Sequence, residues 1–266
     1  MVRTISDDFD YGFHDVSTLL RDKRFSVEVK DWEHGPPELP DEKLTTHQLL
    51  ARHGLFWVPA ADHRRVRKVL APLFTPAAVE STKKEYEFVA GDVFSALAGR
   101  ETVDLVADFT AKYPLRAITY LLGIPRDRQE EFIQFGSAVI DAFYPAISPK
   151  ALRQKMEFLP RGVAMLEQMM EERRKSPGRD FFSKLIHARE QGEKLTPKEI
   201  VSMVALMISA GCEPPRHLIS FAIYDLLRHP DQLETLRSEP DLLRNAIDEA
   251  GRGAEACVRR SVISWS

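Results

Sequence analysis

Residues 208–217 read Ile-Ser-Ala-Gly-Cys-Glu-Pro-Pro-Arg-His and lie in the middle of an apolar stretch that runs from Ile200 to Leu227. The length of this stretch predicts one central helix, yet two adjacent prolines are unusual inside a helix. An interior proline removes a backbone donor and clashes with the preceding turn, which costs about 3 kcal/mol. A glycine beside such a break often marks a place where a helix opens. We therefore expect a groove here, and it is the first candidate for a functional site.

The composition allows a large core and excludes several classes of protein. The chain has 266 residues, of which 44% are hydrophobic, and its 37 Lys and Arg nearly balance 40 Asp and Glu. Because the net charge is only −3, no general field would attract nucleic acid or an anionic membrane, and neither is expected as a partner. Two cysteines are too few for a disulfide framework, and the N-terminus lacks the apolar core of a signal peptide. We expect a cytoplasmic protein.

Apolar residues recur at spacings of three and four along most of the chain, which predicts a mainly α-helical fold. Three helix starts place a hydroxyl cap before a proline at the first helical position. These starts are Thr75-Pro76, Ser148-Pro149 and Thr196-Pro197. Glu199 lies three residues after Thr196 and completes a capping box. No shift in composition marks a linker, so the helical segments are expected to form one domain.

Two charged patterns are candidates for chemistry. His63 and Arg67 are four residues apart in a basic helical turn, so they project from the same face and together can hold a carboxylate or a phosphate. The alternative is a solvated basic face. Glu249 and Arg252 lie one turn apart, and a single pair of this kind is usually a surface ion pair of little energetic value.

Taken in chain order, a set of short motifs resembles the bacterial cytochromes P450, which are haem-thiolate monooxygenases. The motifs are Tyr11 to Ser26, His63-x-x-x-Arg67, Pro72 to Pro76, Leu121 to Pro125, Ala210-Gly211-Cys212-Glu213, Leu226 to Leu233 and Ala246 to Arg252. Each motif is weak alone, but the combination is specific and covers almost the whole chain up to Arg252. The resemblance implies a single, incomplete P450-like helical domain over residues 1–252. Most of the small β-sheet regions and the C-terminal haem-ligand layer would be missing from it.

The resemblance also implies roles for particular residues. His63 and Arg67 would neutralise the haem propionates through charge-assisted contacts. Ala210 and Gly211 match the small residues that let the central helix pass close to the haem, and Glu213 matches the acid that helps deliver protons to bound oxygen. Glu249 and Arg252 would then have a structural role near the haem-ligand loop. No metal site other than the haem is expected.

Three departures from the family pattern stand out. Pro214 and Pro215 occupy the place where a hydroxyl side chain is usual beside Glu213. The cysteine loop that supplies the axial thiolate of the haem iron lies well beyond the Glu-x-x-Arg motif in the family, whereas this chain stops 14 residues after Arg252. Neither Cys212 nor Cys257 has the surroundings of that loop. We therefore expect a chain that is truncated at both ends, with a tail at residues 253–266 that is unrelated to the family and disordered.

Three functions follow from these features. The first is a monooxygenase that oxidises a small apolar substrate with electrons from a ferredoxin-type donor, and that is inactive in this truncated form. The second is a haem-free auxiliary protein that activates a partner enzyme, and the third is a fragment without function. Candidate substrate contacts are Leu55, Phe56 and Trp57, together with Phe143-Tyr144-Pro145, because their aromatic and aliphatic character suits an apolar ligand. Plain core packing is the alternative for each.

Overall fold

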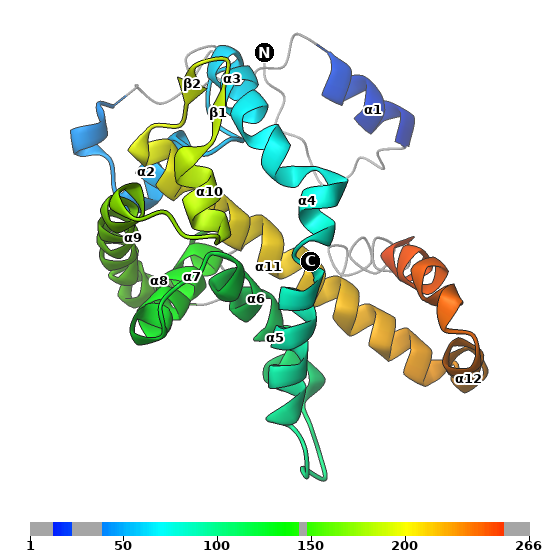
Figure 1. The fold of residues 1–266 in the computed structure, drawn as a ribbon. Helices are drawn as coiled ribbons and strands as arrows, with labels where there is room; N and C mark the ends of the chain where they lie inside the picture. Colours follow the sequence, from blue (N-terminus) through cyan, green and yellow to red (C-terminus); the bar gives the residue numbers. More distant parts are fainter. Residues whose placement is uncertain (1–12, 23–38, 144–147, 253–266) are drawn as a thin grey trace.

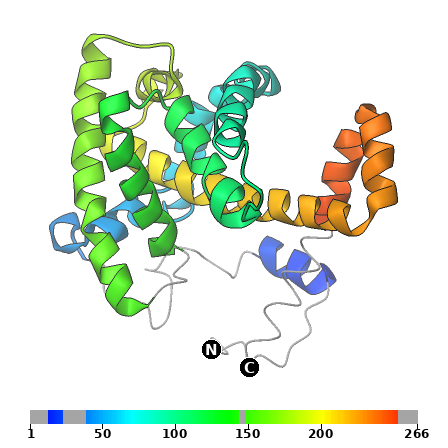
Figure 2. The same cartoon turned by 90° about the horizontal axis from the view of Figure 1, so that it is seen from below.

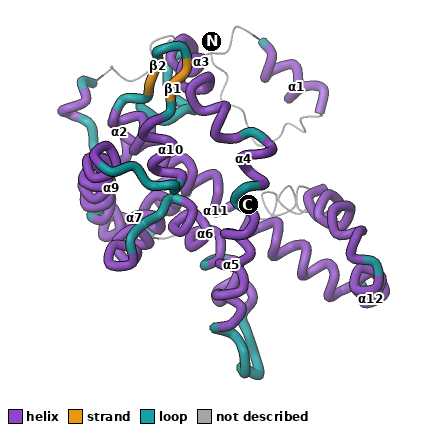
Figure 3. Tube along the Cα trace, viewed as in Figure 1, coloured by secondary structure: helices purple, strands orange, loops and turns teal. Residues whose placement is uncertain are grey.

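The computed structural model describes residues 13–22, 39–143 and 148–252, and the fold within these ranges is mainly α-helical, as predicted (Figures 1 and 3). The helices before the central one are α1 Phe13–Arg21, α2 Thr46–Arg52, α3 Ala60–Leu70, α4 Pro76–Glu80, α5 Lys83–Ser95, α6 Tyr113–Leu121, α7 Gln129–Phe143, α8 Pro149–Met156, α9 Phe158–Lys175 and α10 Phe181–His187. The last two labelled helices are α11 Pro197–Arg228 and α12 Pro230–Ser238, and residues 243–252 are also helical. Short helical turns are η2 Asp41–Lys43, η3 Ala71–Phe74, η4 Leu105–Thr110, η5 Arg126–Arg128 and η6 Pro240–Leu242.

One small antiparallel sheet appears in the described residues. It pairs β1 Arg189–Glu190 with β2 Glu193–Lys194, in the register Arg189 to Lys194 and Glu190 to Glu193. Gly192 lies in the turn between the strands with φ +85°, a left-handed conformation that glycine adopts without steric cost. This hairpin connects α10 to α11 and packs beside α3 (Figure 1).

The three predicted helix starts are confirmed at the level of their hydrogen bonds. Thr75 accepts from the Ala78 amide and Ser148 accepts from the Ala151 amide, each at the head of a helix whose first residue is proline. Thr196 and Glu199 form the full capping box at the start of α11. These caps satisfy amides that a helix leaves without partners in its first turn.

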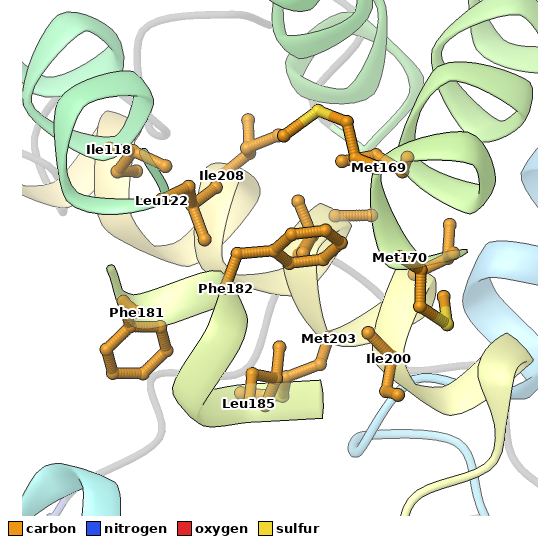
Figure 4. Close-up of a cluster of buried hydrophobic side chains, with 14 of the residues drawn as sticks. Ile118, Leu122, Met169, Met170, Phe181, Phe182, Leu185, Ile200, Met203 and Ile208 are labelled. Atoms are coloured by element: carbon orange, nitrogen blue, oxygen red, sulfur yellow. The ribbon is translucent and has the colours of Figure 1, made fainter. Parts of the chain in front are cut away.

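The main core lies around the first half of α11, where α6, α7, α9 and α10 surround it. Figure 4 shows the Phe182 side chain pointing from α10 toward α9, where Met169 and Met170 lie. Phe182 and Ile208 have no exposed surface, and Met169 is 1% exposed. Burying one such side chain stabilises the folded state by roughly 1.5–3 kcal/mol. This cluster therefore holds the helices of the main core together.

The second half of α11 leaves this body. Figure 2 shows it projecting to one side, where it carries α12 and the helical residues 243–252. We call the part formed by residues 213–252 the arm. Several large apolar side chains of the arm are exposed, among them Tyr224 at 52%, Leu227 at 64% and Leu243 at 54%. The arm therefore has an apolar surface that the described residues leave uncovered.

The predicted single central helix is confirmed, and the two prolines Pro214 and Pro215 do not break it. Helix α11 continues through both prolines from Pro197 to Arg228. A proline removes one hydrogen bond but leaves its neighbours in helical geometry when the flanking turns are held. Here the preceding turns are held by the core, and Glu213 bridges the prolines by bonding Arg216 on the next turn.

Residues 253–266 lie outside the described ranges, as do Tyr144 and Pro145 and both ends of the motif from Tyr11 to Ser26. The predicted boundary between a domain at residues 1–252 and an unrelated tail therefore stays a prediction. Within the described part of the chain, no helix is both long enough and apolar enough to cross a membrane.

Candidate functional site

The turn of α11 that carries the Ala-Gly-x-Glu motif lies where the helix leaves the core. Cys212 is the last buried residue of α11, and Ala210 on the neighbouring face is exposed. Gly211 is half-buried and approaches α6 closely, since a Cβ added there would lie 3.1 Å from Cδ1 of Ile118. Close packing against Ile118 therefore explains why a glycine stands at position 211. Ala210 presents only a methyl group to the exposed face.

Glu213 contacts two side chains of its own helix, Arg216 and His217. Its Oε1 accepts a hydrogen bond from Nη1 of Arg216 at 3.2 Å, and its Oε2 lies 3.7 Å from Nε2 of His217. The Glu213 side chain is only 17% exposed, whereas that of His217 is 54% exposed. The acid is therefore compensated before any ligand approaches it.

The hydroxyl groups nearest to Glu213 along the helix are engaged elsewhere. The Ser209 hydroxyl donates to the Leu206 carbonyl at 3.1 Å. The Ser220 hydroxyl donates to the Arg216 carbonyl at 2.8 Å and lies 2.8 Å from the hydroxyl of Thr110 on η4. Neither serine replaces the hydroxyl that Pro214 lacks.

His63 and Arg67 both lie on α3, with His63 half-buried and Arg67 exposed. No side-chain hydrogen bond or ion pair to another described residue occupies either of them. They therefore remain available to an anion, as both the propionate interpretation and the solvated-face interpretation require.

Sequence reasoning missed the cation that docks α3 on the rest of the fold. Arg65 pairs with Glu199, the capping-box residue of α11, and also donates to the carbonyl of Lys194 at 3.0 Å. Arg65 and Glu199 are 134 residues apart in the chain, and no local pattern marks them as partners. This contact ties α3 to the start of α11, about 16 Å along the helix from Ala210 at 1.5 Å per residue. The two parts of the predicted site are thus on elements that are directly linked.

A second missed cluster surrounds Asp41 on η2. Asp41 bonds the side chains of Lys198 on α11, Arg52 at 3.0 Å and His53 at 2.9 Å. Hydrogen bonds from Lys198 first, then from Arg52 and His53, hold the pKa of the Asp41 carboxyl well below its usual range. The cluster fastens the segment before α3 to the start of α11.

The predicted substrate contacts fall into two groups. Leu55 packs against the main core, which agrees with the core-packing alternative. Phe56 and Trp57 are 63% and 49% exposed, so they are free to meet a ligand or another element. Phe143 packs against the core and meets the ring of His47 edge-on, with 5.2 Å between the ring centroids.

Glu249 and Arg252 form the expected ion pair, with 2.7 Å between Oε2 and Nη1, but both side chains are more than 70% exposed. Pairs in such a position contribute little to stability. They remain candidates for a structural role only if a further element covers them.

Two cavities of the described residues lie away from the α11 motif. One of about 380 Å³ opens between α3 and the β1–β2 hairpin, with Arg64 and Lys68 on one wall and Glu190 and Glu193 on the other. In the part of the chain that the structure describes, no three His, Cys, Asp or Glu side chains gather in a way that suits a metal ion.

Comparison with known proteins identifies the family. Residues 30–250 match the family model "Cytochrome P450". The chain is 36% identical over 250 residues to the epothilone C/D epoxidase of Sorangium cellulosum, covering 90% of this chain and 58% of that protein. The chain belongs to the cytochrome P450 family, whose members bind haem.

Solved structures agree with this assignment. The crystal structure of epothilone D-bound cytochrome P450epoK matches with a TM-score of 0.74 and 35% identity, over 90% of this chain and 60% of that one. P450BioI in complex with an acyl carrier protein that bears hexadec-9Z-enoic acid matches with a TM-score of 0.73 and 28% identity, over the same shares. The chain spans about 60% of the length of these P450 structures.

The described residues fit part of a haem environment. His63 and Arg67 offer side-chain N–H donors for carboxylates, and Ala210 leaves a small-residue surface on α11. The described residues do not supply the thiolate ligand of the haem iron. Cys212 is buried, and burial raises the pKa of its thiol to about 12, so it is not a thiolate at neutral pH. The described residues thus suit the edge and one face of a haem but supply no thiolate.

Proposed function

We propose that this chain forms the oxygen-side part of a cytochrome P450 monooxygenase that oxidises a small apolar organic molecule. The observation that carries the proposal is the turn of α11 with Ala210 exposed beside Glu213, in a chain whose residues 30–250 match the family. Haem, when bound, supplies the iron at which dioxygen is activated. The residues of this chain position that haem and the substrate.

His63 and Arg67 are assigned to the haem propionates. Both side chains lie on one helix, four residues apart, and neither is neutralised by a described carboxylate. A cationic pair of this geometry forms charge-assisted hydrogen bonds with two carboxylates and so fixes the orientation of a planar ligand.

Glu213 is assigned to proton transfer beside the oxygen site. Its carboxylate is held in place by Arg216 and approached by His217. With Pro214 and Pro215 next to it, no side-chain hydroxyl completes the pair that is usual in the family. We infer that this centre uses reducing equivalents inefficiently unless another hydroxyl replaces the missing one.

The substrate is assigned to a class and not to a compound. The relatives named above include an epothilone epoxidase and a P450 that binds a fatty acid carried by a protein. An apolar polyketide-like or acyl molecule therefore fits the lineage, with Phe56 and Trp57 as exposed aromatic contacts and Leu55 behind them. A ferredoxin-type protein is the proposed electron donor.

The alternative is a haem-free auxiliary protein that binds a partner enzyme. The exposed apolar surface of the arm favours it, because surfaces with large exposed apolar side chains commonly bind other proteins. The same surface suits the monooxygenase as well, since it would receive the part of the fold that this chain does not span.

Haem titration of the purified chain tests these functions. The chain alone should bind haem weakly and show no thiolate band with carbon monoxide under reduction. The chain extended after Arg252 with the remaining segment of the epothilone C/D epoxidase should take up one haem and show that band. Absence of haem uptake by the extended chain would contradict the monooxygenase assignment and favour the auxiliary alternative.

Alanine variants of the extended chain test the propionate assignment. His63→Ala and Arg67→Ala should each weaken haem binding about tenfold, because each removes one charge-assisted hydrogen bond. Arg64→Ala is the matched control on the same helix, since Arg64 faces the cavity beside the β1–β2 hairpin. If haem occupancy is unchanged in both test variants, the basic turn is a solvated face.

A further inference from the structure

The β1–β2 hairpin places like charges opposite each other on both of its faces. In the register of the two strands, Arg189 lies opposite Lys194, and Glu190 lies opposite Glu193. Directly opposite residues of an antiparallel pair share a face, whereas successive residues along a strand point to opposite faces. One face of the hairpin is therefore cationic and the other is acidic. Like charges in opposite positions are destabilising, so each face calls for counter-charges beside it.

Only the acidic face meets counter-charges within the described part of the chain. Its two carboxylates line the cavity of about 380 Å³, and Arg64 and Lys68 of α3 form the facing wall. The cations of the other face, Arg189 and Lys194, line a second cavity of about 440 Å³ together with residues of α9, α10 and the start of α11. No carboxylate is among the described residues that line this second cavity. The cationic face therefore lacks the compensation that the acidic face has.

The cations of the second cavity keep donors available for a ligand. The guanidinium of Arg189 is held by two carbonyls at the end of α10, at 3.1 and 2.7 Å, but both bonds use Nη1 alone. The ammonium of Lys194 makes no hydrogen bond or ion pair with another described residue. Arg174 of α9 also lines the cavity, and its Nη1 pairs with Glu171, which is 61% exposed. Three cations thus meet in one cavity with a single, solvated carboxylate beside them.

The size and charge of this cavity select a small anion with several negative charges. Its volume lies in the range of small-molecule sites, roughly 300–1,000 Å³. The fork of N–H donors on an arginine matches the oxygens of a phosphate group, and a lysine adds a compact positive charge. Because the cations come from α9, β1 and β2, an anion that extends over two phosphate groups contacts more of them than a single carboxylate does.

We propose that this cavity binds a diphosphate group, with Arg189 and Lys194 as its main contacts and Arg174 at its edge. The group belongs either to inorganic diphosphate or to a small organic diphosphate. Once bound, it offsets the repulsion between Arg189 and Lys194 and connects the end of α9 to the hairpin that precedes α11. Haem takes no part in these contacts, so the site is independent of the proposed monooxygenase activity.

Isothermal titration calorimetry of the purified chain tests the site with inorganic diphosphate and with sulfate at one ionic strength. Diphosphate should bind at a single site, about tenfold more tightly than sulfate, because more charge-assisted contacts act on one ligand. Dimethylallyl diphosphate distinguishes the two sources of the group. Tighter binding of this compound would assign the site to organic diphosphates, and equal or weaker binding would assign it to the free anion.

The variants Lys194→Gln and Arg189→Gln should each weaken diphosphate binding roughly 3- to 10-fold. The change at Lys194 leaves in place the backbone carbonyl that accepts from Arg65. Lys68→Gln is the matched control, since it removes the same charge from the cavity on the other face of the hairpin and should leave the affinity nearly unchanged. Circular dichroism verifies the fold of each variant.

Equal affinity for diphosphate and sulfate would overturn the proposal, and so would the absence of measurable binding of diphosphate. Equal weakening by Lys68→Gln and Lys194→Gln would overturn it too, because net charge alone would then attract the anion. Arg189 also holds the end of α10. If its variant does not fold, Lys194→Gln decides the outcome, since its side chain has no described partner to lose.

Discussion

The two halves of α11 have similar apolar content but different surroundings. In the first half, from Glu199 to Cys212, ten residues are buried, and α2, α6, α7 and α9 lie around them. Beyond Cys212 no residue of the helix is buried, although Ile219 packs partly buried against the small cluster of Val89, Val93, Phe109 and Ala117 (Figure 2). The difference shows that an apolar helix is stabilised by what packs on it, since both halves are rich in apolar residues but only one is buried.

The second half of α11 also has large apolar side chains that are exposed. Tyr224 and Leu227 are 52% and 64% exposed, and the chain spans about 60% of the length of the P450 structures named above. In the arm, the Ser220 hydroxyl donates to the Arg216 carbonyl one turn back and also lies 2.8 Å from the hydroxyl of Thr110 on η4. Buried side chains stabilise the first half of α11, whereas the second half has no buried residue. The following predictions test that contrast.

The largest expected effect is the loss of a core side chain from the first half. Ile208→Ala should lower the free energy of unfolding by about 2–5 kcal/mol, because Ile208 is fully buried and its removal leaves a cavity. Leu227→Ala, in the second half, should change it by less than about 0.5 kcal/mol. Urea unfolding followed by circular dichroism measures both, and similar losses in the two variants would contradict the contrast.

A substitution at the junction of the halves should act in the opposite direction. Pro214→Ala restores a helical hydrogen bond and removes a clash, so we expect the free energy of unfolding to rise by about 1–3 kcal/mol. Pro197→Ala should give no such rise, since that proline occupies the first helical position. Thermal unfolding of the two variants measures both changes. A Pro214→Ala chain that unfolds at a lower temperature than the parent would show that the folded structure requires proline at this position.

The anchor at the start of the first half should depend on pH. The pKa of Asp41 is lowered in the folded chain, chiefly by Lys198 and then by Arg52 and His53, so its contribution is present above the unfolded-state pKa near 4 and is lost as pH falls below it. Asp41→Asn should cost about 1 kcal/mol at pH 6, a modest value because Lys198 is 56% exposed. The cost should shrink by pH 3. A cost that is equal at both pH values in urea titrations would exclude the electrostatic origin.

The smallest effect is expected on the arm. Glu249→Gln removes the ion pair with Arg252, but both side chains are largely exposed, so the free energy of unfolding should change by less than about 0.5 kcal/mol. Added salt should make the variant and the parent chain indistinguishable. A loss above about 1 kcal/mol would mean that the pair is buried by some other part of the protein.

Much of the fold was predictable because its signals are local. The caps at Thr75, Ser148 and Thr196 bond amides three residues away, and Gly123 ends α6 in the left-handed conformation with φ +64°. Such interactions depend on neighbouring residues and little else. The family followed from motifs of the same local kind, and the match over residues 30–250 confirmed it.

The candidate site was only partly predictable. The sequence identifies Glu213 and the two prolines that follow it. It also shows directly that no hydroxyl side chain stands beside Glu213 at positions 214 and 215. It gave no sign that Arg216 and His217 would compensate the acid, or that Gly211 would face Ile118 on α6. Those outcomes depend on helix rotation and on which elements pack together.

The sequence by itself determined the class of protein, the helix starts and the residues that could carry chemistry, because these depend on covalent structure and on contacts within one helical turn. Only the tertiary structure decided that Gly211 faces Ile118, that Arg65 docks on Glu199, and that Asp41 holds Lys198. Each of these results needs partners from distant parts of the chain. The free energy that fixes them comes from packing, and local sequence does not encode which surfaces will meet.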